Sequence, residues 1–111
     1  MALTVELREE DSGEHAFRVA MWAHMLALEA GVDSEEAKLI ELAARLHDIG
    51  KVVIPDSVIR KRTALSQGER QLIETHAATG ADFLIRAKVP YAALAEEIAR
   101  YHHEAWSGEG Y

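Results

Sequence analysis

The chain has 111 residues, of which 49% are hydrophobic and 28% are charged, and this balance predicts a single folded domain. It has no cysteine, which excludes a disulfide framework and a thiolate zinc site, and no apolar run approaches the roughly 20 residues of a membrane-spanning helix. The formal net charge of -7 argues against a nucleic-acid surface, and nothing resembles a signal peptide, so we expect a cytoplasmic protein.

A first helix is predicted over residues 14–30, where apolar side chains recur at the spacing of one helical face. Asp11 or Ser12 can cap its start, and Gly31 ends it because glycine readily adopts the left-handed conformation of a helix terminus. His24 lies on the apolar stripe of this helix, and we interpret it as a structural residue.

A second helix is predicted to begin after Asp33, because Asp33 followed by Glu36 is similar to a capping box. One face of this helix carries three apolar side chains, Leu39, Ala43 and Leu46. We expect the helix to reach His47 and to stop at Gly50.

The next segment is looser, and Pro55 can open a short helical turn that runs through Ile59. Ser66 and Glu69 form another capping-box pattern. This pattern predicts a third long helix that continues to about Ala87.

The last predicted helix follows Pro90, which breaks the chain, and it carries His102 near its end. Residues 104–111 contain two glycines and are predicted to form a loop. Only residues 52–54 have β-branched character, and this run is too short to found a sheet. The sequence therefore predicts an all-α fold.

Four features carry candidate chemistry, and each contains histidine. They are His15 near a helix start, His47-Asp48 at a helix end, His76 within a helix, and His102-His103 at another helix end. Each alone has a structural explanation, such as the interaction of a histidine with the C-terminal end of a helix dipole. Together they predict a metal site, because helix ends converge in a bundle and imidazole is the commonest metal ligand in proteins. Adjacent ligands can face one site only where the helix ends or distorts, and Gly50 allows this after Asp48.

The string His47-Asp48-Ile49-Gly50-Lys51 resembles the signature of the HD phosphohydrolases, and more specifically of the HD-GYP subgroup. The supporting motifs are Leu46, Ile54-Pro55-Asp56, Leu65-Ser66 with Glu69, His76 with Gly80, and the closing segment HHEAWSGEGY. The resemblance covers nearly the whole chain from Asp11 onward. It implies an HD-domain helical bundle that hydrolyses the bacterial second messenger cyclic di-GMP to a linear dinucleotide or GMP.

The resemblance also implies two divalent transition-metal ions. Iron or manganese is favoured by the family, while zinc or nickel also suits histidine and carboxylate ligands. One ion is expected on His15, His47 and Asp48. The other is expected on Asp48, as a bridging ligand, together with His76, His102 and His103. Two such ions about 3.5–4 Å apart can polarise a phosphodiester and supply hydroxide at neutral pH.

Asp48 and Lys51 are the expected catalytic residues. In the family the lysine of the motif faces the phosphate, so Lys51 is expected to bind substrate and to steady the charge that develops on phosphorus. Arg18, one turn from His15, is a second candidate for substrate binding. Its alternative interpretation is a surface ion pair.

The chain departs from the family pattern at several positions. Ser107 replaces an aspartate of the closing loop, and Arg62-Thr63 replaces a Pro-Gly pair. Asp11 stands where some members have a glutamate for a third metal, and we expect it to cap the helix instead. The chain stops at Tyr111, before a later aspartate ligand. We therefore expect the HD domain of residues 1–111 to be incomplete at its C-terminus, with a weaker first metal site and poor hydrolysis by this segment alone.

Three functions from different classes stay open. The first is an active cyclic di-GMP phosphodiesterase, and the second is an HD phosphohydrolase that acts on another nucleotide or phosphoester. The third is a regulatory signalling module with weakened catalysis. We also expect a homodimer that covers apolar faces near Leu46 and Ile98, and attached sensor or receiver domains. Neither a nucleic-acid duplex nor membrane insertion is expected for this segment.

Overall fold

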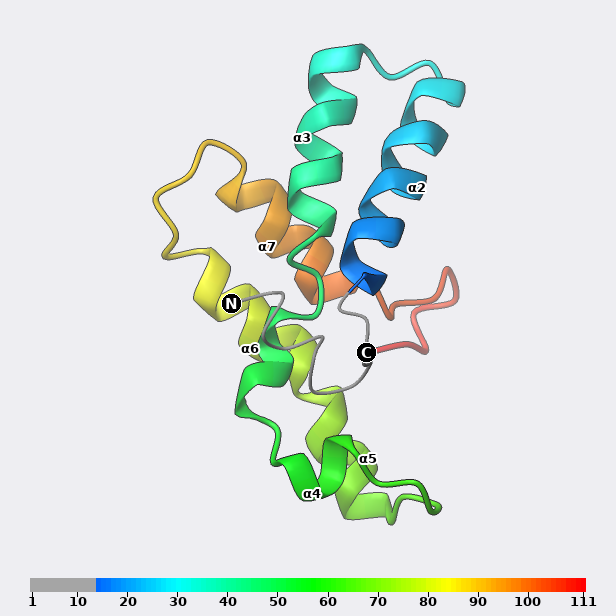
Figure 1. Cartoon of the computed structure of the whole chain (residues 1–111), viewed down its shortest axis with the longest axis vertical. Helices are drawn as coiled ribbons and strands as arrows, with labels where there is room; N and C mark the ends of the chain where they lie inside the picture. The colour runs from blue at the N-terminus through cyan, green and yellow to red at the C-terminus, as the bar shows by residue number, and fades with distance from the viewer. Residues whose placement is uncertain (1–13) are drawn as a thin grey trace.

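The computed structural model describes residues 14–111, and the chain is helical over this part (Figure 1). The elements are α2 (His15–Glu29), α3 (Ser34–Ala44), the 3-10 helix η1 (Ile49–Val53), α4 (Asp56–Ile59), α5 (Gln67–Glu74), α6 (His76–Leu84) and α7 (Ala92–Tyr101). No strand occurs in residues 14–111, so the prediction of an all-α fold is confirmed. None of these helices has the length and apolar character needed to cross a membrane.

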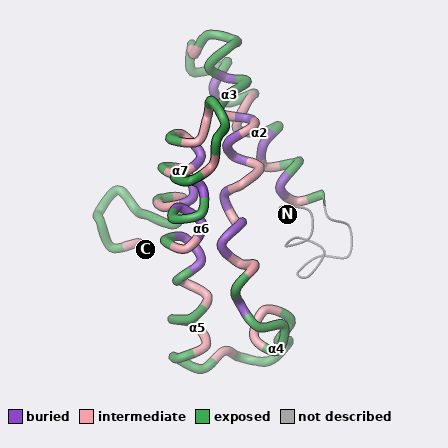
Figure 2. Tube along the Cα trace, turned by 90° about the vertical axis from the view of Figure 1, so that its left-hand side faces the viewer, coloured by how far each residue is buried: buried purple, intermediate pink, exposed green. Residues whose placement is uncertain are grey.

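The helices pack as a small bundle with one extended end. α2 and α3 lie side by side as an antiparallel pair, α3 packs on α7, and α7 packs on α6, which also contacts η1 (Figure 1). The core lies where α3, η1, α6 and α7 meet. It is formed by Ala43, Ile49, Ala81, Leu84, Ala95 and Ala99. Because most of these side chains are small, the helices approach closely. The buried residues line the facing sides of the helices, while the loop before the C-terminus is exposed (Figure 2).

Local signals placed the helix starts correctly. Asp33 caps α3 by accepting hydrogen bonds from two backbone N–H groups of the first turn, and Gly31 before it has a φ of 86°. Pro55 precedes α4. The capping box of Ser66 and Glu69 is complete, since each side chain accepts the backbone N–H of the other residue.

The predicted capping residues Asp11 and Ser12 lie outside the described residues. Glu14 immediately precedes α2, and its side chain makes no capping hydrogen bond.

Two predicted helices differ from the structure. α3 ends at Ala44 instead of reaching His47, and the chain continues through turns into η1, which contains Gly50. The third predicted helix is interrupted at Thr75, which separates α5 from α6, and α6 ends at Leu84 instead of near Ala87.

Side chains compete with the backbone at the interruption and at the end of α3. At the interruption, the Thr75 hydroxyl donates to the carbonyl of Leu72 at 2.6 Å, and the His76 ring bonds the carbonyl of Ile73. At the end of α3, the His47 ring bonds the carbonyl of Ala44. A carbonyl that accepts a hydrogen bond from a side chain does not depend on a backbone N–H donor of the next turn, so the helix can end or change direction there.

Gly50 has a different role from the predicted helix stop. A Cβ atom at this position would overlap the backbone carbonyl of His76 and lie 2.6 Å from the amide nitrogen of Gly80. η1 and α6 therefore touch backbone to backbone, and this contact brings the turn after α3 against the first turn of α6. The pairing of Gly50 with Gly80 explains both glycines of the sequence motif.

The predicted apolar faces are only partly correct. Ala43 is buried and Leu46 is half-buried, but Leu39 is 39% exposed. Leu46 and Ile98 are partly buried against the core, while Ile98 also lines an open, mostly apolar hollow together with Leu94 and Tyr101. Large exposed apolar side chains are also concentrated on α2, at Phe17, Met21, Trp22, Met25, Leu26 and Leu28.

A buried carboxylate of α3 lies at the contact with α2. Glu41 accepts hydrogen bonds from Lys38 and Arg45 at 2.8 Å each, and the Nδ1 atom of His24 lies 3.3 Å from it. The hydrogen bond from Lys38 is the main cause that holds the pKa of Glu41 below its ordinary value. The Arg45 guanidinium also lies 5.2 Å from the centre of the Phe17 ring. His24 thus takes part in helix packing, as its structural interpretation requires.

The close contact between η1 and α6 predicts that Gly50→Ala lowers the free energy of unfolding by about 2 kcal/mol or more, because a methyl group there must displace backbone. Gly68→Ala is the matched control, since nothing lies within 4 Å of the position where its Cβ would be. That control is expected to leave stability unchanged or raise it by up to about 1 kcal/mol. Urea unfolding followed by circular dichroism measures both variants. A Gly50→Ala chain as stable as the parent would contradict the backbone contact.

Candidate metal centre

The structure gathers all the predicted metal ligands on one side of the bundle. His15 begins α2, His47 and Asp48 lie between α3 and η1, His76 begins α6, and His102 and His103 follow α7. They form two groups whose possible ligand atoms all lie within 4.8 Å of one another. We call them the His15 group (His15, His47 and Asp48) and the His76 group (Asp48, His76, His102 and His103). Asp48 belongs to both, while binding of metal by either group stays a prediction.

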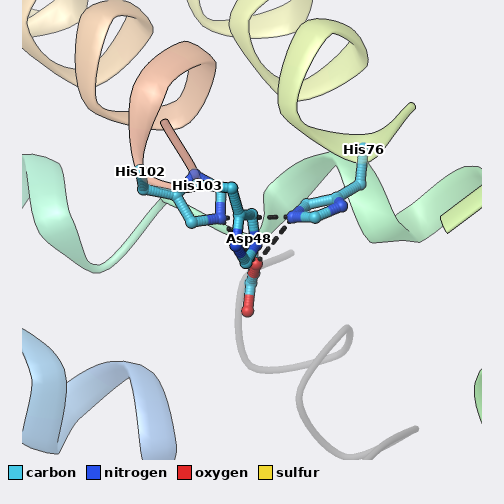
Figure 3. A group of neighbouring side chains, drawn as sticks. All are labelled: Asp48, His76, His102 and His103. Atoms are coloured by element: carbon cyan, nitrogen blue, oxygen red, sulfur yellow. Dashed lines mark hydrogen bonds and ion pairs between the residues drawn. The ribbon is translucent and has the colours of Figure 1, made fainter. Parts of the chain in front are cut away.

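The His76 group surrounds one oxygen of the shared carboxylate (Figure 3). The Nε2 atoms of His76 and His102 lie 3.2 and 3.3 Å from Asp48 Oδ1, and they are 3.2 Å from each other. The His76 side chain is only 1% exposed. Three atoms that can each offer a lone pair therefore meet in a mostly buried space.

The other oxygen of Asp48 faces the His15 group. The Nε2 atom of His47 lies 3.2 Å from Oδ2, and the Lys51 ammonium lies 3.0 Å from the same oxygen. The rings of His15 and His47 are 5.8 Å apart between centroids. Asp48 thus turns one oxygen toward each group, which is the arrangement that a carboxylate needs to bridge two cations.

Backbone carbonyls orient three of the imidazoles in the same way. Each of these rings places Nδ1 against the carbonyl oxygen three residues earlier: His47 on Ala44 at 2.8 Å, His76 on Ile73 at 2.5 Å, and His102 on Ala99 at 2.9 Å. A carbonyl oxygen only accepts hydrogen bonds, so Nδ1 must carry the proton. In the neutral ring Nε2 then keeps a free lone pair, and all three Nε2 atoms point at Asp48.

This arrangement of tautomers leaves one oxygen of a buried carboxylate without a donor. Asp48 Oδ1 is buried and has no hydrogen-bond partner among the described residues, although two imidazole nitrogens lie close to it. Lone pairs that face a carboxylate repel it unless a cation lies between them. The residues therefore fit a divalent ion bound by nitrogen and oxygen, which iron, manganese, zinc and nickel all accept.

Burial and neighbouring charge set the protonation states of the site. Burial would raise the pKa of Asp48, but the hydrogen bonds that His102, His47 and His76 donate to it when their rings are protonated outweigh burial and hold the pKa well below its ordinary range. Desolvation, reinforced by His102 and His76, lowers the pKa of His103 to about 4. At neutral pH the site therefore contains one carboxylate and a neutral His103 with a lone pair available.

His47 behaves differently from His103. Burial alone would lower its pKa, but the hydrogen bond and charge of Asp48 more than compensate, so the pKa of His47 lies above its ordinary value. Protons therefore compete with a metal for His47 at a higher pH than they do for His103.

Arg18 makes the surface ion pair that was its alternative interpretation, with 3.5 Å between its guanidinium and the Glu14 carboxylate. Both side chains are at least half exposed, so this contact contributes little to stability. The role of Arg18 in substrate binding stays a prediction.

Two features of the site were missed by the sequence reasoning. The Tyr111 ring stacks on His103, with 4.5 Å between centroids and 21° between planes. Glu104 closes the loop that carries this tyrosine. Both residues were recognised only as parts of a terminal motif, and the glycine at position 110 was the one local sign of a tight approach.

Comparison with known proteins agrees with this geometry. A family model described as HD domain matches residues 1–111. The chain belongs to the HD domain family. The resemblance read from the His47–Lys51 string is thereby confirmed at the level of the family.

Relatives of this HD domain have names that refer to cyclic dinucleotides. The chain is 40% identical to a Vibrio cholerae protein named 3'3'-cGAMP-specific phosphodiesterase 2, over 100% of this chain and 21% of that protein. It is 37% identical to a Thermotoga maritima protein named cyclic di-GMP phosphodiesterase, over 96% of this chain and 29% of that one. It is 36% identical to a Xanthomonas campestris protein named cyclic di-GMP phosphodiesterase response regulator RpfG, over 100% of this chain and 29% of that protein. The chain thus spans less than a third of the length of these relatives.

The opposite pKa shifts of His47 and His103 predict the order in which bound metal leaves on acidification. As the pH falls from 8, the His15 group is expected to lose its ion first, because His47 takes up a proton at higher pH than an ordinary histidine. The His76 group is expected to hold its ion longer, since His103 stays unprotonated down to about pH 4. Visible spectra and metal content of the cobalt-loaded chain at successive pH values measure this order. His15→Ala identifies the ion that leaves first, and earlier loss from the His76 group would contradict the prediction.

Proposed function

We propose that this HD domain is the metal-binding part of a phosphodiesterase that hydrolyses cyclic di-GMP to a linear dinucleotide or GMP. The observation that carries the proposal is the placement of Asp48, which turns Oδ1 toward the His76 group and Oδ2 toward the His15 group. Divalent ions held there would polarise the phosphodiester and lower the pKa of water, so that hydroxide is available at neutral pH. Iron and manganese are the favoured metals for these two ions.

The composition of the site suits an anionic substrate. Apart from Asp48, the ligands of both groups are histidines, and neutral imidazoles do not cancel the charge of the ions they hold. Two divalent ions sharing a single carboxylate would leave this corner of the protein positive, against a formal net charge of -7 for the whole chain. A phosphodiester would therefore be attracted to this site and repelled elsewhere.

Lys51 is the residue proposed to contact the reacting phosphate. Its ammonium lies 3.0 Å from Asp48 Oδ2, and its side chain is 14% exposed, so it is held at the edge of the centre. An ammonium at this place can donate a hydrogen bond to a phosphate oxygen and stabilise negative charge as the bond to phosphorus breaks. Arg18, near the start of α2, is proposed as a second contact with the substrate, in exchange for its exposed pair with Glu14.

The names of the relatives support the class of substrate, and they favour a second candidate within it. The Vibrio cholerae relative at 40% identity is named for 3'3'-cGAMP, so we propose this dinucleotide as the alternative to cyclic di-GMP. Both contain phosphodiester bonds between ribose units, on which the same metal centre can act. Another phosphoester, or a regulatory role with weakened catalysis, are the further alternatives.

We also propose that the domain forms a homodimer and is attached to further domains. A homodimer would cover the apolar side chains exposed on α2, and attached sensor or receiver domains would account for the greater length of the relatives.

The proposal predicts that Asp48→Asn removes both metal binding and hydrolysis, with a loss of at least about 100-fold in turnover, because one substitution affects both groups. Asp33→Asn is the matched control, since Asp33 is an exposed helix cap and asparagine caps equally well. Elemental analysis gives the metal content, and chromatography follows cyclic di-GMP and 3'3'-cGAMP with added manganese or iron, before and after chelation.

Three outcomes separate the alternatives. Turnover that depends on metal and on Asp48 supports the phosphodiesterase, and the preferred dinucleotide identifies the substrate. Metal bound through Asp48 without turnover of either compound, in the full-length protein as well as in this segment, would favour the other phosphoester or the regulatory role. Hydrolysis that survives both Asp48→Asn and chelation would contradict the proposal.

A further inference from the structure

We propose that Glu104 is a positioning residue that closes loop 104–111 and thereby holds the Tyr111 ring against His103. The ring then takes the place of the backbone carbonyl that orients the other histidines around Asp48. The inference rests on the metal centre of the proposed function, but it concerns contacts made by the chain itself.

His103 lacks the support that the neighbouring ligands have. His47, His76 and His102 each place Nδ1 against a backbone carbonyl, whereas no such carbonyl meets His103 among the described residues. His103 is also the one exposed member of the His76 group. Its orientation must therefore come from ring contacts on its two sides.

Those ring contacts are supplied by His102 and Tyr111. The His103 ring lies 4.1 Å from the His102 ring at 46°, and on Tyr111 it is nearly parallel, at 4.5 Å and 21°. Tyr111 also meets the edge of His76, with 6.2 Å between centroids. A tyrosine in this place fixes the plane of His103 and limits the access of water to its face.

Glu104 brings Tyr111 back to the site. One carboxylate oxygen of Glu104 accepts the backbone N–H groups of Ala105 and Gly110, each at 2.8 Å, and so joins the two ends of the loop. Gly108, with a φ of 79°, lies in the bend between them. The chain then reaches Tyr111, whose backbone N–H bonds the carbonyl of His103 at 3.4 Å.

Gly110 shows how tight this closure is. A Cβ atom at this position would overlap the carbonyl oxygen of His103 and lie 2.7 Å from the amide nitrogen of Ala105. A larger residue would push the end of the loop, and Tyr111 with it, away from the imidazole. Glu104 and Gly110 therefore act on the same contact from two independent positions.

The first test needs no metal. Ring currents of Tyr111 shift the His103 ring protons, so NMR of the metal-free chain reports the stacking directly. Glu104→Ala, Gly110→Ala and Tyr111→Ala are expected to move these signals in the same direction, toward the values of an unstacked histidine. Glu104→Gln keeps an acceptor oxygen and Tyr111→Phe keeps the ring, so both are expected to stay close to the parent.

The second test measures cobalt affinity of the His76 group from its visible spectrum. Glu104→Ala and Tyr111→Ala are each expected to weaken binding about tenfold, the loss typical of residues that orient a ligand. The double variant is expected to lose no more than either single one, because both act through one contact. Glu109→Ala is the matched control, since the exposed carboxylate of Glu109 lies in the same loop and, within the described part of the chain, hydrogen-bonds the Ser107 hydroxyl alone, at 3.2 Å.

The two tests have separate consequences. Unmoved His103 signals in Glu104→Ala and Gly110→Ala, or losses of affinity that add in the double variant, would overturn the positioning role. His103 signals that move as expected in a chain that binds no cobalt would support the positioning role while contradicting the proposed metal centre.

Discussion

The arrangement of the site depends on one repeated hydrogen bond, from the Nδ1–H of a histidine to the carbonyl three residues earlier. It occurs at His47, His76 and His102. The bond has two effects, because it occupies a carbonyl of the preceding turn and also fixes which nitrogen of the ring is free. At His47 and His76 it coincides with the end of α3 and the interruption between α5 and α6. The same contact thus shapes the helices and turns the imidazoles toward Asp48.

Once the rings are fixed, the environment of Asp48 follows. Its carboxylate is mostly buried, and its two oxygens face different sets of imidazole nitrogens. Among residues 14–111, Lys51 alone provides a nearby ammonium, and its hydrogen bond is to Oδ2. Oδ1 is left with lone pairs around it, which is unfavourable without a cation. Packing of Gly50 on Gly80 keeps this arrangement in place, because it joins the turn that holds Asp48 to the helix that begins with His76.

The sequence predicted the helix caps and missed features that depend on the orientation of side chains. Caps such as Asp33 and Ser66 were identified because the capping side chain and the backbone N–H groups that donate to it lie within one turn. The interruption at Thr75 was missed, since the apolar period continues across it and only side-chain bonds to the backbone reveal it. The residues predicted as ligands are brought together by the fold in two groups, while metal binding by them stays a prediction. Their shared tautomer and the stacking of Tyr111 could not be inferred from spacing, because both depend on orientation in space.

The central claim is that Asp48 bridges two ions held through Nε2 atoms. Anomalous X-ray diffraction from manganese-loaded crystals of this chain tests it most directly. The account predicts two anomalous peaks about 3.5–4 Å apart, with Oδ1 of Asp48 bound to the ion of the His76 group and Oδ2 to the ion of the His15 group. Peaks that contact Asp48 through a single oxygen, or ligation by the Nδ1 atoms that now face backbone carbonyls, would contradict it.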